Sequence, residues 1–324
     1  MIEPTTTFLE LTVVVDGVRI ACRDRGAGDP VVFLHGTPSH SYIWRNVVPT
    51  VEAQGYRVLT YDLLGYGESE RPVDRDTSVA GQAVLLEQLL DHFGVERLAL
   101  VAHDIGGAIA QIFGTKHPER LEALVLLDTV SYDSWPSETW REIIRNHLDT
   151  YVAMPQNEFE AMLRRQLEMT VAEPANMAGA TLEAYLAPHR SAIGRASFFE
   201  HQVRHYDSTY TERVADQLDQ LTMPVRILWG AEDRWQPTTY AERLASDIPG
   251  AELVIIPQAG HFVIEDAPER VTEQILDVLG TSALSRGCRS KVGVRWVKRR
   301  WWVSWRDRVR LGGRCERVGL FRSR

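Results

Sequence analysis

The sequence predicts an α/β fold: a mostly parallel, twisted sheet with helices on both faces and an inserted helical cap. Two observations lead to this expectation. Short, almost wholly apolar runs alternate with segments long enough for one helix, which is typical of parallel strands covered on both faces. One long interval then breaks this alternation with helical sequence alone. With 324 residues, of which 44% are hydrophobic, the chain is long enough to bury one large core.

The predicted strands begin with a hairpin. In LTVVVDGVRIACRD, the pair Asp16-Gly17 supplies a tight turn between two β-branched runs. Helical patterns such as VAGQAVLLEQLLDHFG, which ends at Gly94, fill most of the later intervals. Strands joined by such helices are parallel neighbours, so the order of elements predicts a parallel sheet. The later strands are predicted at residues 31–35, 56–62, 97–103, 121–128, 224–230 and 251–257.

The long interval covers residues 132–215. It contains no convincing strand and is rich in Met and aromatic residues, as in NEFEAMLRRQLEMT. An interval of that size between two core strands predicts an inserted helical domain, which we call the cap (132–215). The core is then expected in two parts, residues 1–131 and residues 216–284.

The remaining residues, 285–324, form a basic, Trp-rich tail after the expected last core helix, PERVTEQILDVLG. The tail holds 14 of the 36 Lys and Arg residues and 2 of the 44 Asp and Glu residues, which leaves a net charge of −20 on residues 1–284. An acidic body offers no electrostatic surface for nucleic acid, so only the tail could contact a nucleic acid or an anionic membrane. The simpler expectation is a disordered extension without a role in the chemistry of the core.

The composition also bears on cofactors and compartment. Cys22, Cys288 and Cys315 are too few and too scattered for a disulfide framework or a zinc cluster. The N-terminal stretch MIEPTTTFLELTVVVDG lacks a basic segment followed by an apolar run, so no signal peptide is expected. No run approaches the roughly 18 apolar residues of a membrane span. These features favour a soluble, cytoplasmic protein without a metal.

The stretch VAHDIGGAIA, residues 101–110, predicts a sharp turn from a buried strand into a helix. Small residues around such a turn let the side chain at its apex, here Asp104, project above the sheet, as in a nucleophile elbow. The leading glycine of that motif is replaced by Ala102. An Asp just before a helix is more often an N-cap, so this stretch alone leaves both interpretations open.

Four further motifs also follow predicted strands. FLHGTPSHSYIWRNVVP places His-Gly-Thr-Pro at residues 35–38, and YDLLGYGESERP follows the next strand. WGAEDRWQP and QAGHFVIEDAPE place Asp233 and His261 after the last two strands, so the chain order is Asp104, Asp233, His261. With these motifs the chain resembles the α/β-hydrolase fold superfamily, and within it the aspartate-nucleophile branch of epoxide hydrolases and haloalkane dehalogenases. The resemblance covers residues 9–280 or so, is weakest in the cap and is absent from the tail.

This resemblance implies a role for each residue. A serine nucleophile needs a base to take its proton, whereas a carboxylate with a free pKa of about 3.9 is already ionised at neutral pH. Asp104 is therefore expected to attack a saturated carbon and form an alkyl ester, and His261 to activate the water that hydrolyses this ester. Asp233 is expected to orient His261. The backbone N–H groups of Thr37 and Ile105 are expected to form the oxyanion hole.

Other polar residues near the strand ends have competing interpretations. Asp128, which ends LEALVLLD, is an alternative triad acid, because some dehalogenases that resemble this chain take their acid from that strand end. The turn that contains Asp233 favours Asp233 instead. His35 is expected to support the oxyanion loop, and Asp62 and Ser69 to shape turns.

The leaving group decides between two activities. In dehalogenases that resemble this chain, a Trp after the nucleophile and an Asn after the His-Gly pair help to hold the halide. Here those positions are Ile105 and Thr37, which carry neither an indole nor an amide donor. Trp135 or Trp140 of the cap is a candidate substitute, although packing within the cap is the simpler explanation of both.

Related epoxide hydrolases protonate the ring oxygen with tyrosines of the cap. Tyr185, Tyr206 and Tyr210 are the candidate acids here, and each is also explained as ordinary cap core. The leading hypothesis is an epoxide hydrolase that forms a diol from a small hydrophobic substrate and water without a cofactor. The near alternative is a haloalkane dehalogenase with a relocated halide site. An alternative of another class is a non-catalytic or membrane- or nucleic-acid-tethered protein of the same fold.

Overall fold

The computed structural model describes residues 8–282, so the predicted tail at 285–324 lies outside the described residues. Its centre is an eight-stranded sheet in the order β1-β2-β4-β3-β5-β6-β7-β8. Strands β3 to β8 pair in parallel, whereas β1 and β2 are antiparallel at one edge, which confirms the predicted mostly parallel sheet. The strands are β1 (Leu11–Val15), β2 (Val18–Arg25), β3 (Pro30–Leu34), β4 (Arg57–Tyr61), β5 (Leu98–His103), β6 (Leu121–Leu127), β7 (Val225–Gly230) and β8 (Glu252–Ile256).

The N-terminal hairpin forms at the predicted turn. Asp16 and Gly17 have φ values of 48° and 78°, the left-handed conformation that a tight turn between twisted antiparallel strands requires. Val15 pairs with Val18 directly across this turn. The hairpin then joins the sheet, because β2 pairs with β4.

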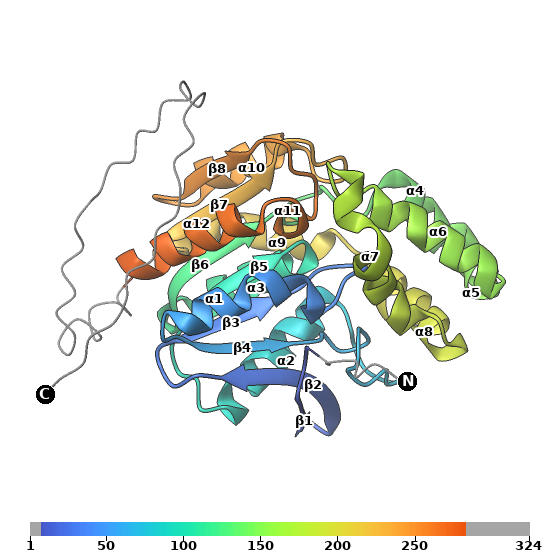
Figure 1. The fold of residues 1–324 in the computed structure, drawn as a ribbon, viewed down its shortest axis with the longest axis horizontal. Coiled ribbons are helices and arrows are strands. Elements are labelled where there is room, and N and C mark those ends of the chain that lie inside the picture. The colour runs from blue at the N-terminus through green and yellow to red at the C-terminus, as the bar shows by residue number, and fades with distance from the viewer. Residues whose placement is uncertain (1–7, 283–324) are drawn as a thin grey trace, which may run out of the picture.

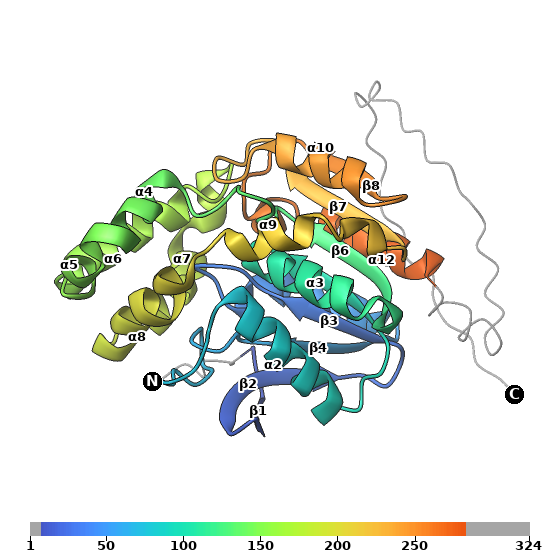
Figure 2. The same cartoon turned by 180° about the vertical axis from the view of Figure 1, so that it is seen from behind.

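Helices cover both faces of the sheet, as predicted. Figure 1 shows α1, α11 and α12 on the near face, and Figure 2 shows α2, α3 and α9 on the opposite face. No helix within residues 8–282 combines the length and the apolarity needed to cross a membrane. The α-helices of the core are α1 (Val48–Ala53), α2 (Val79–His92), α3 (Ile105–Lys116), α10 (Thr238–Asp247), α11 (Val263–Asp266) and α12 (Pro268–Thr281).

The strands bury alternate side chains in two cores, one on each face. In β3, Val32 and Leu34 pack in the core beneath α2 and α3, whereas Val31 and Phe33 pack in the core beneath α1 and α12. Complete burial of one such side chain stabilises the fold by roughly 1.5–3 kcal/mol. Strand β8 departs from the prediction of strands covered on both faces. It lies at the edge of the sheet, and its first residue, Glu252, is exposed.

Residues 132–215 lie between β6 and β7 and contain helices but no strand. Figure 1 shows α4 to α8 gathered at one end of the sheet. A contact between Thr37, which follows β3, and Tyr206 places this segment beside the carboxyl ends of the parallel strands, where open α/β sheets bind their ligands. The last helix, α9, packs against the core helix α3. The α-helices of this segment are α4 (Glu138–Glu142), α5 (Leu148–Val152), α6 (Gln156–Glu168), α7 (Gly179–Leu186), α8 (Ala192–Ser197) and α9 (Thr209–Ala215).

Candidate active site

The turn between β5 and α3 holds Asp104 in a strained backbone conformation. Its φ is 53° and its ψ is −122°, and a sparsely populated conformation of this kind costs a non-glycine residue about 1–3 kcal/mol. Two hydrogen bonds stabilise the turn: the Asp104 N–H donates to the Leu127 carbonyl at 3.1 Å, and the Asp104 carbonyl accepts from the Gly107 N–H at 2.9 Å. The side chain makes no N-cap hydrogen bond to α3. Asp104 therefore occupies the N-cap position of α3, but its carboxylate does not cap the helix and is directed to other partners.

Two glycines allow this turn to sit against the loop after β3. A Cβ atom on Gly36 would lie 2.4 Å from the Asp104 Cβ and 2.5 Å from its Oδ1. A Cβ atom on Gly106 would lie 2.5 Å from the His35 carbonyl oxygen. Both distances are far inside van der Waals contact, so any side chain at either position would push the two loops apart.

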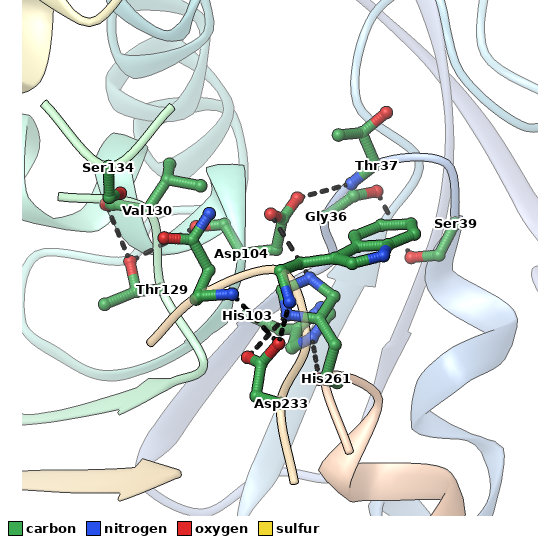
Figure 3. A network of polar contacts seen from close by, with 12 residues as sticks. Gly36, Thr37, Ser39, His103, Asp104, Thr129, Val130, Ser134, Asp233 and His261 are labelled. Carbon is green, nitrogen blue, oxygen red and sulfur yellow. Dashed lines mark hydrogen bonds and ion pairs between the residues drawn. The ribbon is translucent and has the colours of Figure 1, made fainter. Parts of the chain in front are cut away.

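The two oxygens of the Asp104 carboxylate have different surroundings, as Figure 3 shows. Oδ1 accepts a hydrogen bond of 2.7 Å from the Thr37 N–H. Oδ2 lies 3.5 Å from Nε2 of His261. Ile105 is the first residue of α3, where a backbone N–H has no partner within the helix, and it lies beside the same carboxylate. One carboxylate oxygen thus accepts a backbone hydrogen bond, and the other lies beside the imidazole of His261.

His261 is held between two carboxylates. Its Nδ1–H donates to Oδ2 of Asp233 at 2.9 Å, and both side chains are fully buried. The other oxygen of Asp233 accepts the N–H groups of Trp235 at 2.7 Å and Gln236 at 2.9 Å, so the acid is fixed at both oxygens. The ring of Trp235 lies 4.9 Å from that of His261 at an angle of 35°. Figure 3 shows the Asp233–His261–Asp104 series in one view.

The charges in this series favour ionised groups. Burial opposes ionisation of Asp104, but the hydrogen bond and charge of His261 outweigh it, so the pKa of Asp104 lies below its usual value. Burial likewise opposes the charged form of His261, but the charge of Asp233 and the contact with Asp104 hold the pKa of His261 well above its usual value. Both shifts favour the charged forms of Asp104 and His261.

A cavity of about 310 Å³ opens above Asp104. Residues of both the core and the cap line it, and its walls are mostly apolar and aromatic, with contributions from Ile105, Trp140, Phe198 and Trp235. A cavity of this size fits a small organic substrate with its reacting carbon beside the carboxylate. Within residues 8–282, no group of three or more His, Cys, Asp or Glu side chains is arranged to hold a metal ion.

Comparison with known proteins places the chain among relatives with the same architecture. The family model described as the alpha/beta hydrolase fold matches residues 29–268. The chain belongs to this family. A crystal structure of an α/β hydrolase fold protein from Burkholderia ambifaria is 34% identical, covers 83% of this chain and 97% of that chain, and superimposes with a TM-score of 0.78.

Two curated relatives of this α/β hydrolase have named activities. "Haloalkane dehalogenase 2" of Mycobacterium bovis is 27% identical over 266 residues, which are 81% of this chain and 92% of the relative. "Soluble epoxide hydrolase" of Corynebacterium sp. strain C12 is 28% identical over 294 residues, which are 84% of this chain and 97% of the relative. The chain is a hydrolase of the α/β fold.

In this hydrolase the alternative acid, Asp128, does not contact the imidazole. Its Oδ1 accepts the Gly230 N–H at 2.7 Å, and its side chain is completely buried. Burial, followed by the charge of nearby Asp233, raises the pKa of Asp128 well above its usual value. His261 is bonded to Asp233 instead.

The three tyrosines named as candidate acids differ in their position relative to the cavity. Tyr206 lines the cavity, and its hydroxyl lies 2.6 Å from Oγ1 of Thr37. Tyr185 is fully buried away from the cavity and donates to Glu265 at 2.5 Å. Tyr210 packs against the core beside α3 and does not line the cavity. The structure thus leaves only Tyr206 in position to meet a substrate.

The two candidate halide donors differ in whether the indole N–H already has a partner. Both Trp135 and Trp140 line the cavity. The Trp135 indole N–H already donates to Oγ1 of Thr211 at 3.0 Å. Among residues 8–282, the Trp140 indole N–H has no such partner, and its ring packs against Tyr206 at a centroid distance of 6.4 Å. Of these two tryptophans, Trp140 is the one whose indole N–H has no partner among residues 8–282.

The residues expected to shape loops do so. His35 donates from Nδ1 to the Gly36 carbonyl at 2.8 Å and accepts the Leu63 N–H at Nε2, and burial lowers its pKa to about 4. It is therefore a neutral support of the oxyanion loop. Asp62 accepts backbone N–H groups of two loops at 2.7 and 2.8 Å, and Ser69 donates to the Asp62 carbonyl.

Among the cavity residues that sequence reasoning missed, three follow one another on one loop. Arg234, Trp235 and Gln236 all line the cavity. They directly follow Asp233 in WGAEDRWQP, so their position at the end of β7 was the signal that could have identified them. A loop that carries a triad acid places its next residues beside the imidazole as well.

Proposed function

We propose that this hydrolase opens epoxides through a covalent ester on Asp104 and releases a diol. The observation that carries the proposal is the division of labour between the two carboxylate oxygens: Oδ1 accepts the Thr37 N–H, and Oδ2 faces His261 and the cavity. An anion held in this way is ready to attack without first losing a proton. The same backbone donor is in place for the charge that forms later on Oδ1.

In the first half-reaction, Oδ2 of Asp104 attacks a ring carbon of the epoxide and the bond from that carbon to the ring oxygen breaks. The oxygen takes both electrons of the broken bond and needs a proton. Tyr206 supplies it, because burial raises the pKa of Tyr206 in spite of its hydrogen bond with Thr37 and so favours the protonated phenol. The products are an alkyl ester on Asp104 and a neutral hydroxyl group.

Ester formation also changes the imidazole. Once Asp104 is esterified, one of the two anions beside His261 is neutral, so the pKa of His261 falls. The proton that His261 releases restores Tyr206, and the neutral imidazole is then the base for the second half-reaction. Epoxide opening consumes one proton at this step, and the resting imidazolium provides one.

In the second half-reaction, His261 takes a proton from water as the water oxygen bonds to Cγ of Asp104. The negative charge that develops on Oδ1 is stabilised by the Thr37 N–H and the N–H of Ile105. Collapse of this intermediate breaks the ester bond, and the departing alkoxide takes the proton of the new carboxyl group. The diol leaves, and Asp104 and His261 are again charged.

Substitution of the base tests this proposal. In His261→Gln the first half-reaction has its nucleophile but the second has no base, so the ester should accumulate. Incubation with a terminal epoxide should add the mass of one epoxide to the peptide that contains Asp104, and the double variant Asp104→Asn/His261→Gln should gain nothing. The same adduct in the double variant, or no adduct with any epoxide, would contradict the proposal.

A second candidate function is hydrolysis of a carbon–halogen bond at the same carboxylate. The free Trp140 indole N–H in the cavity wall favours it, because a departing halide needs N–H donors. A halide accepts no proton, so the imidazolium proton would have to leave for solvent before water could be activated. Halide release from bromoalkanes and diol formation from epoxides of equal length separate the two candidates.

A further inference from the structure

Two charged side chains line the cavity, and only one of them has a role in the proposed reaction. Asp104 is the nucleophile, and the other charge is the guanidinium of Arg234. The remaining lining residues are apolar, aromatic or neutral and polar. A lone cation in the wall of a small, mostly apolar cavity points to the charge of a ligand.

The guanidinium of Arg234 has no polar contact with another side chain or with the backbone among residues 8–282. It is exposed on the loop between β7 and α10, and it makes no ion pair, hydrogen bond or cation–π contact with any residue from 8 to 282. Two partly buried arginines, by contrast, are paired: Arg45 forms a bidentate ion pair with Glu265, and Arg57 forms one with Asp24. The guanidinium of Arg234 is therefore available to a ligand in the cavity.

Gln236, on the same loop, provides an independent observation. Its side chain lines the cavity, it is 5% exposed, and its buried amide oxygen has no hydrogen-bond partner among the described residues. Its backbone is fixed, because its N–H donates to Asp233 at 2.9 Å and its carbonyl accepts the Trp229 indole N–H at 2.8 Å. A buried amide group without a partner is costly, and rotation about its last bond presents either the oxygen or the NH₂ group to a ligand.

We propose that Arg234 and the Gln236 amide form a subsite for a carboxylate on the substrate, so that the hydrolase prefers epoxides that carry a carboxylic acid. The inference rests on the proposed function, since the epoxide end of the substrate must reach Asp104. The planar fork of a guanidinium matches the two oxygens of a carboxylate. Residues 1–284 carry a net charge of −20, so an anionic substrate needs a local cation to enter this cavity.

Matched substrates test the subsite. Each terminal epoxyalkanoate is compared with its primary amide of equal chain length, which keeps the epoxide and the shape but not the charge. For wild type, kcat/KM should favour the carboxylate by about fivefold to tenfold, mainly through KM, because an exposed guanidinium is partly screened by water. This preference should shrink as salt is added.

Variants locate the preference. Arg234→Gln should bring the ratio of kcat/KM for the carboxylate to kcat/KM for the amide close to one or below. Arg234→Lys should keep part of the preference for the carboxylate. Arg213→Gln is the control, because Arg213 is exposed on α9, makes no ion pair among residues 8–282 and lies outside the cavity. It removes the same net charge and should keep the wild-type ratio.

Binding without turnover separates this inference from the proposed function. Calorimetry with hexanoate and hexanamide should show tighter binding of the carboxylate to wild type and the loss of that difference in Arg234→Gln. If no epoxide is consumed but this difference is found, the subsite stands and the proposed function fails. Equal discrimination in wild type and Arg234→Gln, in both turnover and binding, would overturn the subsite.

Discussion

The loops at the carboxyl ends of the strands and the cap meet at one cavity, but they hold their polar groups differently. On the core side, the carboxylates of Asp104 and Asp233 accept backbone N–H groups. On the cap side, the Tyr206 hydroxyl contacts another side chain, that of Thr37, and the indole N–H of Trp140 contacts none among residues 8–282. Groups held by the backbone stay in place when neighbouring side chains change. Under the proposed function, this difference places the nucleophile and the base in the core and the acid for the leaving group in the cap.

The largest expected effect concerns two acids of the core. Asp233→Asn should lower kcat by on the order of 10⁴-fold, because the amide favours the wrong imidazole tautomer and does not stabilise the imidazolium. Asp128→Asn should change kcat by less than about threefold, because His261 is bonded to Asp233 and Asn keeps the acceptor for Gly230. Steady-state kinetics on one epoxide, with circular dichroism as a check of folding, compares them. Similar losses in both variants would remove the distinction between the two acids.

The role of the cap is tested by removing one hydroxyl group. Tyr206→Phe should lower kcat on epoxides by on the order of 10³-fold, because the ring oxygen loses its acid. Tyr210→Phe is the matched control, because Tyr210 does not line the cavity, and it should keep the wild-type rate. If Tyr206→Phe turned over epoxides at the wild-type rate, the acid would have to come from another group.

A methyl group tests how tightly the core must hold its nucleophile. Gly36→Ala places a Cβ atom where the Asp104 side chain lies, so the carboxylate must move. A displacement of this order should lower kcat by about 10²-fold. Gly280→Ala is the control, because a Cβ atom there meets nothing within 4 Å and α12 gains a better helix former. Thermal unfolding should show Gly280→Ala at or above the wild-type midpoint.

The smallest expected effect is a shift in the titration of His261. Its raised pKa means that its charge stabilises the fold fully below its unfolded pKa of about 6.5, and that this contribution is lost as the pH rises through the folded pKa. Asp104 has the opposite sign: its contribution is lost as the pH falls through its lowered pKa. Asp104→Asn removes one anion beside the ring and should lower the pKa of His261. Imidazole proton signals followed by NMR across the pH range measure it, and an unchanged pKa would remove the contact with Asp104 as a cause.

The core could be predicted from sequence because its signals are local. Each run of apolar residues ends at a motif, and parallel strands bring their carboxyl ends to one edge, so Asp104, Asp233 and His261 had to lie near one another. The sequence favoured Asp233 over Asp128 only by the turn that contains it, because both acids follow neighbouring strands; the hydrogen bond of His261 to Asp233 is the direct observation that separates them.

The cap could be predicted only as helical. Its helices are short and interrupted by tighter or wider turns, such as Phe198–Gln202, so the direction of a side chain does not follow from a regular period. Tyr185 and Tyr206 look alike in sequence, yet one is bonded to Glu265 in the interior and the other faces the cavity. The indole of Trp135 is taken by Thr211, a partner far along the chain.

The central claim is that the carboxylate of Asp104 itself forms the bond to the substrate. Single turnover in H₂¹⁸O with enzyme in excess over an epoxide tests it most directly. The account predicts that ¹⁸O enters the carboxylate of Asp104, found in its peptide by mass spectrometry, while the diol of the first turnover carries an unlabelled oxygen from Asp104. A labelled diol with an unlabelled Asp104 would mean that water attacks the epoxide directly, and would contradict the account.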